Sequence, residues 1–201
     1  MLPTKSINPS APRGLSLIEL LIAMSMGLVI GIVLTSLIVN TSRSYRFAQL
    51  QSQTATQIST YLERMSRVLR GSTDVVSVSP TSLTVYAYFS PRDNVPDKVR
   101  YFVDTDNALK VGVIKATGSA PNYTYNSSDE TVQTMLSDLK HGSTPVFTYY
   151  DDSNNQLIGT ITPATVKEIG IRLELNPDQG ILKQNVIGQT RINLRNRKTN
   201  L

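Results

Sequence analysis

The chain is organised by the stretch Arg13-Gly14-Leu15-Ser16-Leu17-Ile18-Glu19 and by the predominantly apolar run that follows it as far as Val39. Glu19 is the only charged side chain in this run. A helix over residues 15–39 would be about 37 Å long, which is enough to cross a bilayer with some tilt. The sequence therefore predicts that residues 15–40 form a membrane-spanning helix.

Glu19 is the unusual feature of this helix. A carboxylate in hydrocarbon costs on the order of 2.5–3.5 kcal/mol, and a helix that serves only as an anchor has no use for one. One alternative is a plain signal-anchor in which Glu19 lies near the headgroups at little cost. A cleavable secretory signal fits less well, because its apolar region would span about 7–15 residues and end at a small-residue cleavage site. Here the run is longer, and polar residues 40–43 follow it.

The order Arg13-Gly14, then apolar residues, then Glu19 resembles the N-terminal signature of type IV pilins and type II secretion pseudopilins. In that family a prepilin peptidase cuts after the glycine on the cytoplasmic side and usually methylates the new N-terminus. The resemblance implies cleavage between Gly14 and Leu15, N-methylation of Leu15 and an assembly role for Glu19, the fifth residue after the cut. Leu15 departs from the phenylalanine that is most common in the family. The likeness covers residues 13–40.

The size of the region beyond the span, together with the late run 190–196, resembles large minor pilins and the J-type pseudopilin. Residues 1–14 are short, polar and rich in proline, and we interpret them as a leader that is removed. The leader carries Lys5 and Arg13 and no acid, which places the N-terminus on the cytoplasmic side of a single-pass protein. The resemblance implies the bacterial cytoplasmic membrane first, and then an extracellular or periplasmic fibre.

Two glycines in the span, Gly27 and Gly31, have the spacing G-x-x-x-G. Small residues at this spacing allow helices to approach closely in a membrane. The alternative is that glycine is simply more frequent in membrane helices than in soluble ones. Both interpretations stay open at this point.

The helical pattern continues beyond the membrane segment. Apolar residues recur every three or four positions, and polar residues occupy the opposite face. The predicted stripe is Phe47, Leu50, Thr54, Ile58, Leu62, Met65 and Leu69. No glycine or proline interrupts it before Gly71, a natural terminator. The sequence predicts one helix from Leu15 to Arg70, apolar all round in its first half and amphipathic over residues 41–70.

After Gly71 the apolar period changes from about four to two, which indicates strands. The predicted strands are 74–78, 82–89, 98–103, 109–114, 146–150, 156–160, 166–175 and 189–194. We expect a loop over residues 116–130 and either a short helix or a strand over 132–139. The predicted fold is α+β and pilin-like: a long N-terminal helix packed on an antiparallel sheet. Residues 41–201 form the predicted globular domain, and 72–201 form its β-rich part.

Composition restricts the chemistry. The chain has 201 residues, a formal charge of +5, no cysteine and a single histidine. Disulfides and thiolate chemistry are therefore excluded, and His141 lies in a stretch typical of a solvated turn. The sequence contains no Gly-rich phosphate loop after a strand and no nucleophile elbow. We expect no enzyme activity, no cofactor and no resident metal.

Two weaker patterns are worth testing. Asp151, Asp152 and Asn154 offer clustered oxygen ligands for calcium, although aspartate and asparagine are also ordinary turn residues. Clustered cations near the C-terminus would suit phosphate contacts with DNA. They are Arg191, Arg195, Arg197 and Lys198. No aromatic residue lies among them for base stacking, so a solvated terminus is the plainer interpretation.

The leading hypothesis is a pilin-like structural subunit of a type IV pilus or a type II secretion-like pseudopilus, and the J-like resemblance implies a minor subunit. Its expected partners are other pilin subunits in a homo- or hetero-oligomeric fibre, the prepilin peptidase, the inner-membrane assembly platform and, before assembly, the membrane. The alternative is a stationary membrane-anchored ectodomain that binds DNA or a surface ligand.

Overall fold

The computed structural model describes residue 14 and residues 16–119 and 122–194. The chain divides into an N-terminal unit that ends at Arg46 and a larger unit that starts at Phe47. Helix α1, Leu17–Arg70, contributes to both and has 54 residues. Its predicted end before Gly71 is confirmed, and it begins at Leu17, whereas Leu15 lies outside the described residues.

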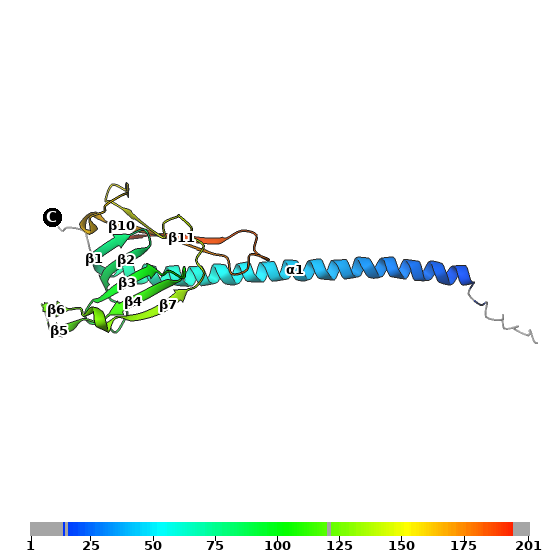
Figure 1. Cartoon of the computed structure of the whole chain (residues 1–201), viewed down its shortest axis with the longest axis horizontal. Coiled ribbons are helices and arrows are strands. Elements are labelled where there is room, and N and C mark those ends of the chain that lie inside the picture. The colour runs from blue at the N-terminus through cyan, green and yellow to red at the C-terminus, as the bar shows by residue number, and fades with distance from the viewer. Residues whose placement is uncertain (1–13, 15, 120–121, 195–201) are drawn as a thin grey trace, which may run out of the picture. The chain divides into compact units, whose positions relative to one another are not determined.

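The strands of the larger unit form two main antiparallel sheets (Figure 1). The five-stranded sheet has the order β1-β2-β3-β4-β7, and the four-stranded sheet has the order β11-β10-β8-β9. The five-stranded sheet consists of β1 (Ser72–Ser79), β2 (Ser82–Ala87), β3 (Asp97–Val103), β4 (Leu109–Ile114) and β7 (Thr131–Leu136). The four-stranded sheet consists of β8 (Phe147–Tyr150), β9 (Gln156–Leu157), β10 (Glu168–Leu175) and β11 (Val186–Asn193).

Several predicted elements need correction. The expected loop over 116–130 contains a small ribbon, β5 (Thr117–Ser119) paired with β6 (Asn122–Thr124), and the 3-10 turn η1 (Ser127–Asp129). The segment 132–139, left open between helix and strand, forms strand β7. The expected strand 156–160 shrinks to the two residues of β9, β11 begins three residues earlier than expected, and η2 (Pro163–Thr165) was not predicted.

The core lies between the C-terminal half of α1 and the inner faces of both sheets. Helix residues Ile58, Met65 and Leu69 are almost fully buried and belong to one continuous apolar cluster with residues of both sheets. Each such side chain contributes about 1.5–3 kcal/mol on burial. The buried stripe begins at Thr54, because Phe47 is 41% exposed and Leu50 is only half-buried. The predicted stripe is thus confirmed over 54–69 and wrong at its start.

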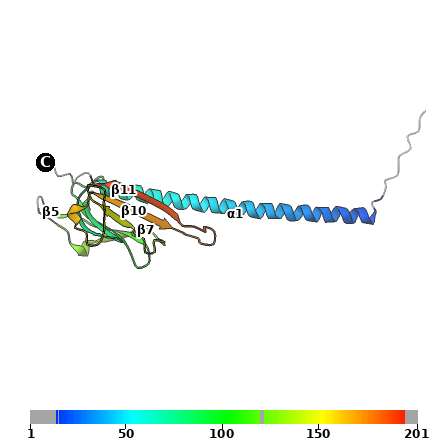
Figure 2. The ribbon, with the colours of Figure 1, turned by 90° about the horizontal axis from the view of Figure 1, so that it is seen from above.

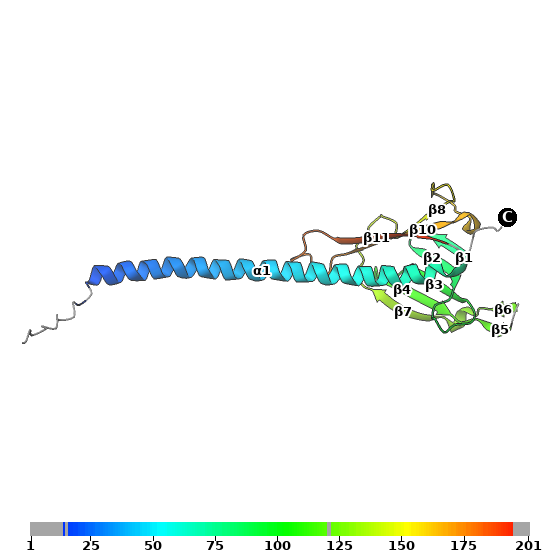
Figure 3. The same ribbon diagram turned by 180° about the vertical axis from the view of Figure 1, so that it is seen from behind.

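Hydrogen bonds at Pro80 and Tyr149 help to join the two sheets. The backbone N–H groups of Val146 and Phe147 donate to the Pro80 carbonyl oxygen at 2.9 and 3.0 Å. The Tyr149 hydroxyl reaches the carbonyl oxygen of Ser79 at 2.8 Å. Figure 1 and the view from behind in Figure 3 place β11 on one side of the C-terminal half of α1 and β7 on the other.

Strand β11 approaches α1 very closely at Gly188. A Cβ atom at this position would lie 2.2 Å from Ile58 Cγ2 and 3.1 Å from Leu62 Cδ1. Only glycine allows this approach without moving core side chains. Figure 2 shows β10 and β11 lying beside this part of the helix.

Candidate functional site

The predicted processing segment lies at the start of the described chain. Gly14 is exposed, and no atom outside its neighbours lies within 4 Å of the position that a Cβ would occupy. Leu15 lies outside the described residues. Cleavage between Gly14 and Leu15 and N-methylation of Leu15 therefore stay predictions.

Glu19 lies in the first turn of α1, and its backbone N–H takes part in the N-terminal cap of the helix. The Glu19 N–H donates to Ser16 Oγ at 3.3 Å, and the Leu20 N–H donates to the Ser16 carbonyl oxygen at 3.1 Å. Ser16 is thus the N-cap, and the sequence Ser-x-x-Glu is the signature of a capping box. The negative charge of Glu19 also suits the positive end of the helix dipole. Any test of Glu19 must separate capping from charge.

The first half of α1 is long and apolar enough to cross a membrane. All side chains from Leu17 to Val39 are exposed. The hydroxyl groups of Ser25 and Thr35 donate to carbonyl oxygens of their own helix at 2.8 Å, so both polar side chains are satisfied without water. Gly27 and Gly31 have no atom within 4 Å of their Cβ positions. Their predicted role in helix packing stays a prediction.

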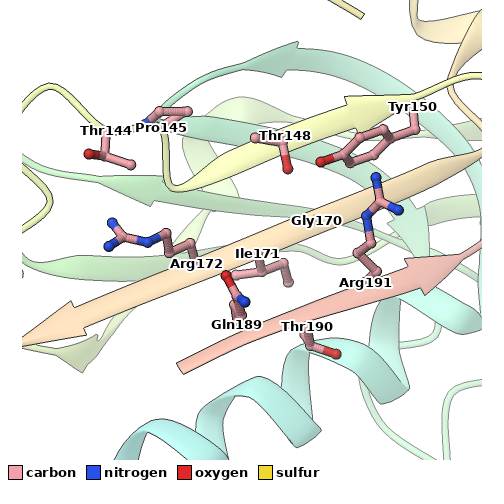
Figure 4. Close-up of a pocket in the computed structure, with 10 residues that line it drawn as sticks. All are labelled: Thr144, Pro145, Thr148, Tyr150, Gly170, Ile171, Arg172, Gln189, Thr190 and Arg191. Atoms are coloured by element: carbon pink, nitrogen blue, oxygen red, sulfur yellow. The ribbon is translucent and has the colours of Figure 1, made fainter. Parts of the chain in front are cut away.

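The outer face of the four-stranded sheet contains a hollow of about 460 Å³ (Figure 4). Its floor is Gly170 in β10, and its walls come from β8, β11 and the segment before β8. Antiparallel register places Gly170 between Thr148 on one side and Arg191 on the other. A Cβ at Gly170 would lie 2.3 Å from Thr148 Oγ1 and 3.3 Å from the Tyr150 ring. The missing side chain therefore creates the space into which its neighbours extend.

Arg191 crosses this space and lies over the ring of Tyr150. Its Cζ atom is 3.6 Å from the ring centroid, and its Nη1 donates to Asn154 Oδ1 at 2.9 Å. The Glu168 carboxylate is 4.0 Å away. The hydrogen bond with Thr148 and the one from Arg191 lower the pKa of Tyr150 below its ordinary value. Three neighbours thus fix this guanidinium, which reduces the entropy lost when a ligand is bound.

The other side of the hollow carries Arg172, whose Nη1 lies 2.6 Å from a Glu174 carboxylate oxygen. Figure 4 shows the guanidinium groups of Arg172 and Arg191 pointing away from each other, with Gln189 and Thr148 between them. The hollow therefore offers hydrogen-bond donors of several kinds, but its two cations do not converge on one anion. This geometry suits a polar ligand that spreads over the face.

The outer face of the five-stranded sheet is built differently. Gly112 in β4 leaves room for Glu130, whose Oε1 would be 1.9 Å from an added Cβ. Glu130 lies across β4 and makes a bidentate pair with Arg100 of β3, with both N–O distances at 2.9 Å. The Arg100 guanidinium also lies over the Phe102 ring, 4.0 Å from its centroid.

A second ion cluster closes the loop between β2 and β3. Lys115 Nζ donates to Asp97 at 2.7 Å and to Asp93 at 2.9 Å. Burial raises the pKa of Asp97 against the opposing effect of Lys115. For Asp93 burial also acts upward, but hydrogen bonds from Lys115 and Ser90 outweigh it and lower the pKa. These groups hold a loop in place, and their oxygens are already occupied.

In the turn proposed for calcium, side-chain oxygens of Asp151, Asp152 and Asn154 all accept hydrogen bonds from protein groups. Asp151 Oδ1 accepts the N–H groups of Ser153 and Asn155 at 3.0 and 2.8 Å, and Asn154 Oδ1 accepts from Arg191. Asn154 has a positive φ of 65°, which is typical of asparagine in a turn. Within residues 16–119 and 122–194, no three His, Asp or Glu side chains come close enough together to hold a metal ion.

The predicted basic patch falls largely outside the described residues, because Arg195, Arg197 and Lys198 belong to the stretch after Leu194. Arg191 is described, and its guanidinium is already engaged by Tyr150 and Asn154. His141 lies in a turn as expected, where its carbonyl oxygen accepts the Thr144 N–H at 2.8 Å.

Comparison of the chain with protein-family models, with curated proteins and with solved structures found no match.

Proposed function

We propose that the chain is a pilin-like structural subunit, of the minor kind, of a type IV pilus or a type II secretion-like pseudopilus. The observation that carries the proposal is the division of helix α1. Its first half is apolar and exposed along its whole length, with Glu19 as the only charge, and its second half is covered by two sheets. A helix of this kind has one half suited to lipid or to other helices and one half that belongs to a folded domain.

In this proposal the apolar half is held first by the membrane and then by neighbouring subunits. Once the chain leaves the bilayer, the exposed side chains between Leu17 and Val39 must be covered, and the same helix of other subunits supplies the cover. Glu19 would then be buried and needs a positive partner, because an unpaired buried charge is strongly destabilising. The amine created at Leu15 of a neighbouring subunit is that partner.

The partners follow from this route. A prepilin peptidase removes residues 1–14 at the cytoplasmic face, and an inner-membrane assembly platform adds the subunit to the fibre. The subunit contacts its neighbours through the apolar half of α1, while the β-rich part faces outward.

Processing is the first test. With the peptidase present, intact mass measurement of the full chain should show loss of residues 1–14 and a methyl group on Leu15. Gly14→Val should leave the precursor in the membrane, because the glycine has no side chain to exclude from a protease cleft. Gly27→Val is the matched control, since it makes the same change at a glycine inside α1, away from the predicted cleavage site, and should be cut normally. Normal cleavage of Gly14→Val would contradict the proposal.

Assembly is the second test, and it must separate charge from capping at Glu19. Glu19→Gln keeps a side chain that a capping box accepts but removes the charge. Ser16→Ala removes the cap and keeps the charge. We expect Glu19→Gln to be cleaved normally but to be depleted from sheared fibres, and Ser16→Ala to enter fibres nearly as wild type does. The opposite pattern would show that Glu19 serves only to start the helix.

A second candidate function is a stationary ectodomain that binds a surface ligand. The observation in its favour is the donor-rich hollow over Gly170, with Arg172, Gln189 and Arg191 around it. This alternative requires no cleavage, so a membrane form that retains residues 1–14 in the presence of the peptidase would favour it.

A further inference from the structure

Open sheet edges attract other strands, and folded proteins usually shorten or cover them. The two main sheets have four edge strands: β1, β7, β9 and β11. Strand β9 has only two residues, and β1 is contacted by η2. Two of the four edges are therefore protected in ordinary ways.

The other two edges, β7 and β11, are longer and less protected, although the pairing of β7 with β4 has one irregularity, between Thr134 and Leu136. They are six and eight residues long. Neither contains proline or lysine, and Arg191 is their only charged residue. Each also carries an exposed large apolar side chain, Val132 in β7 at 46% and Ile187 in β11 at 49%. Such edges are templates for an added strand.

The surfaces beside the two edges have opposite charge. A groove of about 580 Å³ between α1 and β11 is lined by Arg67 and Arg70, with Glu63 as its only acid. A groove of about 350 Å³ on the other side of α1, at the end of β7, is lined by Asp138 and contains no cation. Within the described residues, neither Arg67 nor Arg70 takes part in an ion pair.

The strand directions also fit. Strand β11 runs in the direction of α1, since Gly188 contacts Ile58 and Thr190 lies in the groove that extends to Arg70. Strand β7 runs the opposite way, because its last residue, Leu136, lies in the groove with Thr54 near the start of the buried stripe. Figure 1 shows these opposite directions. In two copies with parallel helices, β7 of one copy and β11 of the next are antiparallel.

We propose that β7 of one copy pairs with β11 of a second copy, so that the sheet continues from subunit to subunit. The pairing joins two different surfaces, so it builds an open series of copies and not a closed dimer. Val132 and Ile187 lie on the outer faces of their sheets, opposite Gly112 and Glu174, and come to the same side of the joined sheet. The proposal extends the proposed function, on which it rests for the parallel orientation of the copies.

The chain has no cysteine, so introduced cysteines report this contact directly. Thr134 and Gln189 are exposed and both face outward, opposite Lys110 and Arg172. We would express full-length Thr134→Cys and Gln189→Cys chains with different tags in the same cells, oxidise the membranes, and measure the mixed disulfide. Gln133→Cys with Gln189→Cys is the matched control, because Gln133 lies opposite Val111 and faces the other side of its sheet.

We expect the Thr134/Gln189 pair to form mixed dimers several-fold more than the control pair, and a chain with both cysteines to form a ladder. Equal yields for the two pairs would overturn the proposal, as would dimers formed by Gln189→Cys alone. Processing and fibre incorporation are measured in the same samples. Fibres without the cross-link would refute the strand pairing only, whereas the cross-link in an unprocessed chain would refute the proposed function only.

Discussion

The outer face of each of the two main sheets has a glycine in an inner strand over which a side chain passes, but the two surfaces that result are different. In the five-stranded sheet Gly112 lets Glu130 cross a strand and pair with Arg100. In the four-stranded sheet Gly170 lets Arg191 cross a strand and lie on Tyr150. In each case a glycine in an inner strand leaves room above that strand, so that side chains from its two sides can meet.

The side chain that crosses the glycine decides whether the surface is closed or keeps a hollow. Glu130 and Arg100 neutralise each other in a two-bond contact, which satisfies both groups and leaves a closed surface. Arg191 meets an aromatic ring and is 4.0 Å from its nearest carboxylate, so its charge is only partly compensated, and a hollow of about 460 Å³ stays open beside it. The comparison teaches that a strand glycine on an outer face can serve either stability or access.

The largest loss of stability should come from substitution of Gly188, the glycine that faces inward. This loss is the reference for the substitutions of Gly170 and Gly112. Gly188→Val would force Ile58 and Leu62 from their positions in the core. We expect a loss of about 3 kcal/mol in the free energy of unfolding, measured by urea denaturation of the full chain in detergent. A loss no larger than that of the outer-face variants would show that β11 can move away from α1 easily.

Gly170→Val should have the second largest effect. Its side chain would meet Thr148 and the Tyr150 ring, which is held in place by Arg191 and cannot simply rotate away. We expect about 1–2 kcal/mol of destabilisation by the same measurement. If the hollow serves access, Thr148→Val, which keeps the shape of the wall, should by contrast be nearly neutral for stability.

Gly112→Ala should cost less, about 1 kcal/mol or below, because it meets the flexible end of Glu130 and disrupts a partly exposed ion pair. A double-mutant cycle sharpens the comparison. Glu130→Gln should destabilise the wild type but add almost nothing to Gly112→Ala, since the pair is already broken there. Full additivity would mean that Glu130 reaches Arg100 even past a methyl group.

The smallest expected effect is a difference in pKa between two neighbouring tyrosines, Tyr149 and Tyr150. Tyr150 on the outer face has a lowered pKa, chiefly through its hydrogen bond with Thr148, whereas burial raises the pKa of Tyr149 on the inner face. Tyrosine resonances followed by NMR should show Tyr150 ionising first, and Thr148→Val should raise its pKa. Simultaneous ionisation of both would contradict the difference between the faces.

These shifts also set a direction for alkaline stability. The raised pKa of Tyr149, and of Tyr101, which is raised by burial as well, stabilises the fold below the ordinary tyrosine pKa of 10.0. This contribution is lost as the pH rises above that value. Tyr150 acts the other way, since its lowered pKa contributes stability only as the pH rises. Burial also raises the pKa of Tyr125, so three tyrosines act against one and the free energy of unfolding should fall above about pH 10.

The sequence was informative wherever a local pattern decides the structure. Gly71 ends the helix as expected, and β4 has the bounds that alternation predicted. The 3.6-residue period located the buried stripe from Thr54 to Leu69 but not its start, because Phe47 lies beside the first residues of β11 in an open groove and stays 41% exposed. The cap at Ser16 has a local signature in the sequence, Ser-x-x-Glu over residues 16–19, which the prediction did not include.

The outer-face features could not be predicted, because they depend on register between distant strands. Nothing local indicates that Gly170 lies between Thr148 and Arg191, or that Gly112 lies between Arg100 and Val132. The ribbon formed by β5 and β6 escaped notice for another reason. Its strands have three residues each and are mostly polar, and β5 contains Gly118 at a positive φ of 98°.

The close packing of β11 along α1 also has a mechanical consequence. The contacts of the helix with the sheets extend side by side from Thr54 to Leu69, and Gly188 meets Ile58 within that length. A pulling force along the helix axis would therefore load these contacts in shear, many at once, instead of peeling them apart in turn. Domains loaded in this way resist tension well, and a force-spectroscopy trace should show one high rupture event for the helix and β11 together.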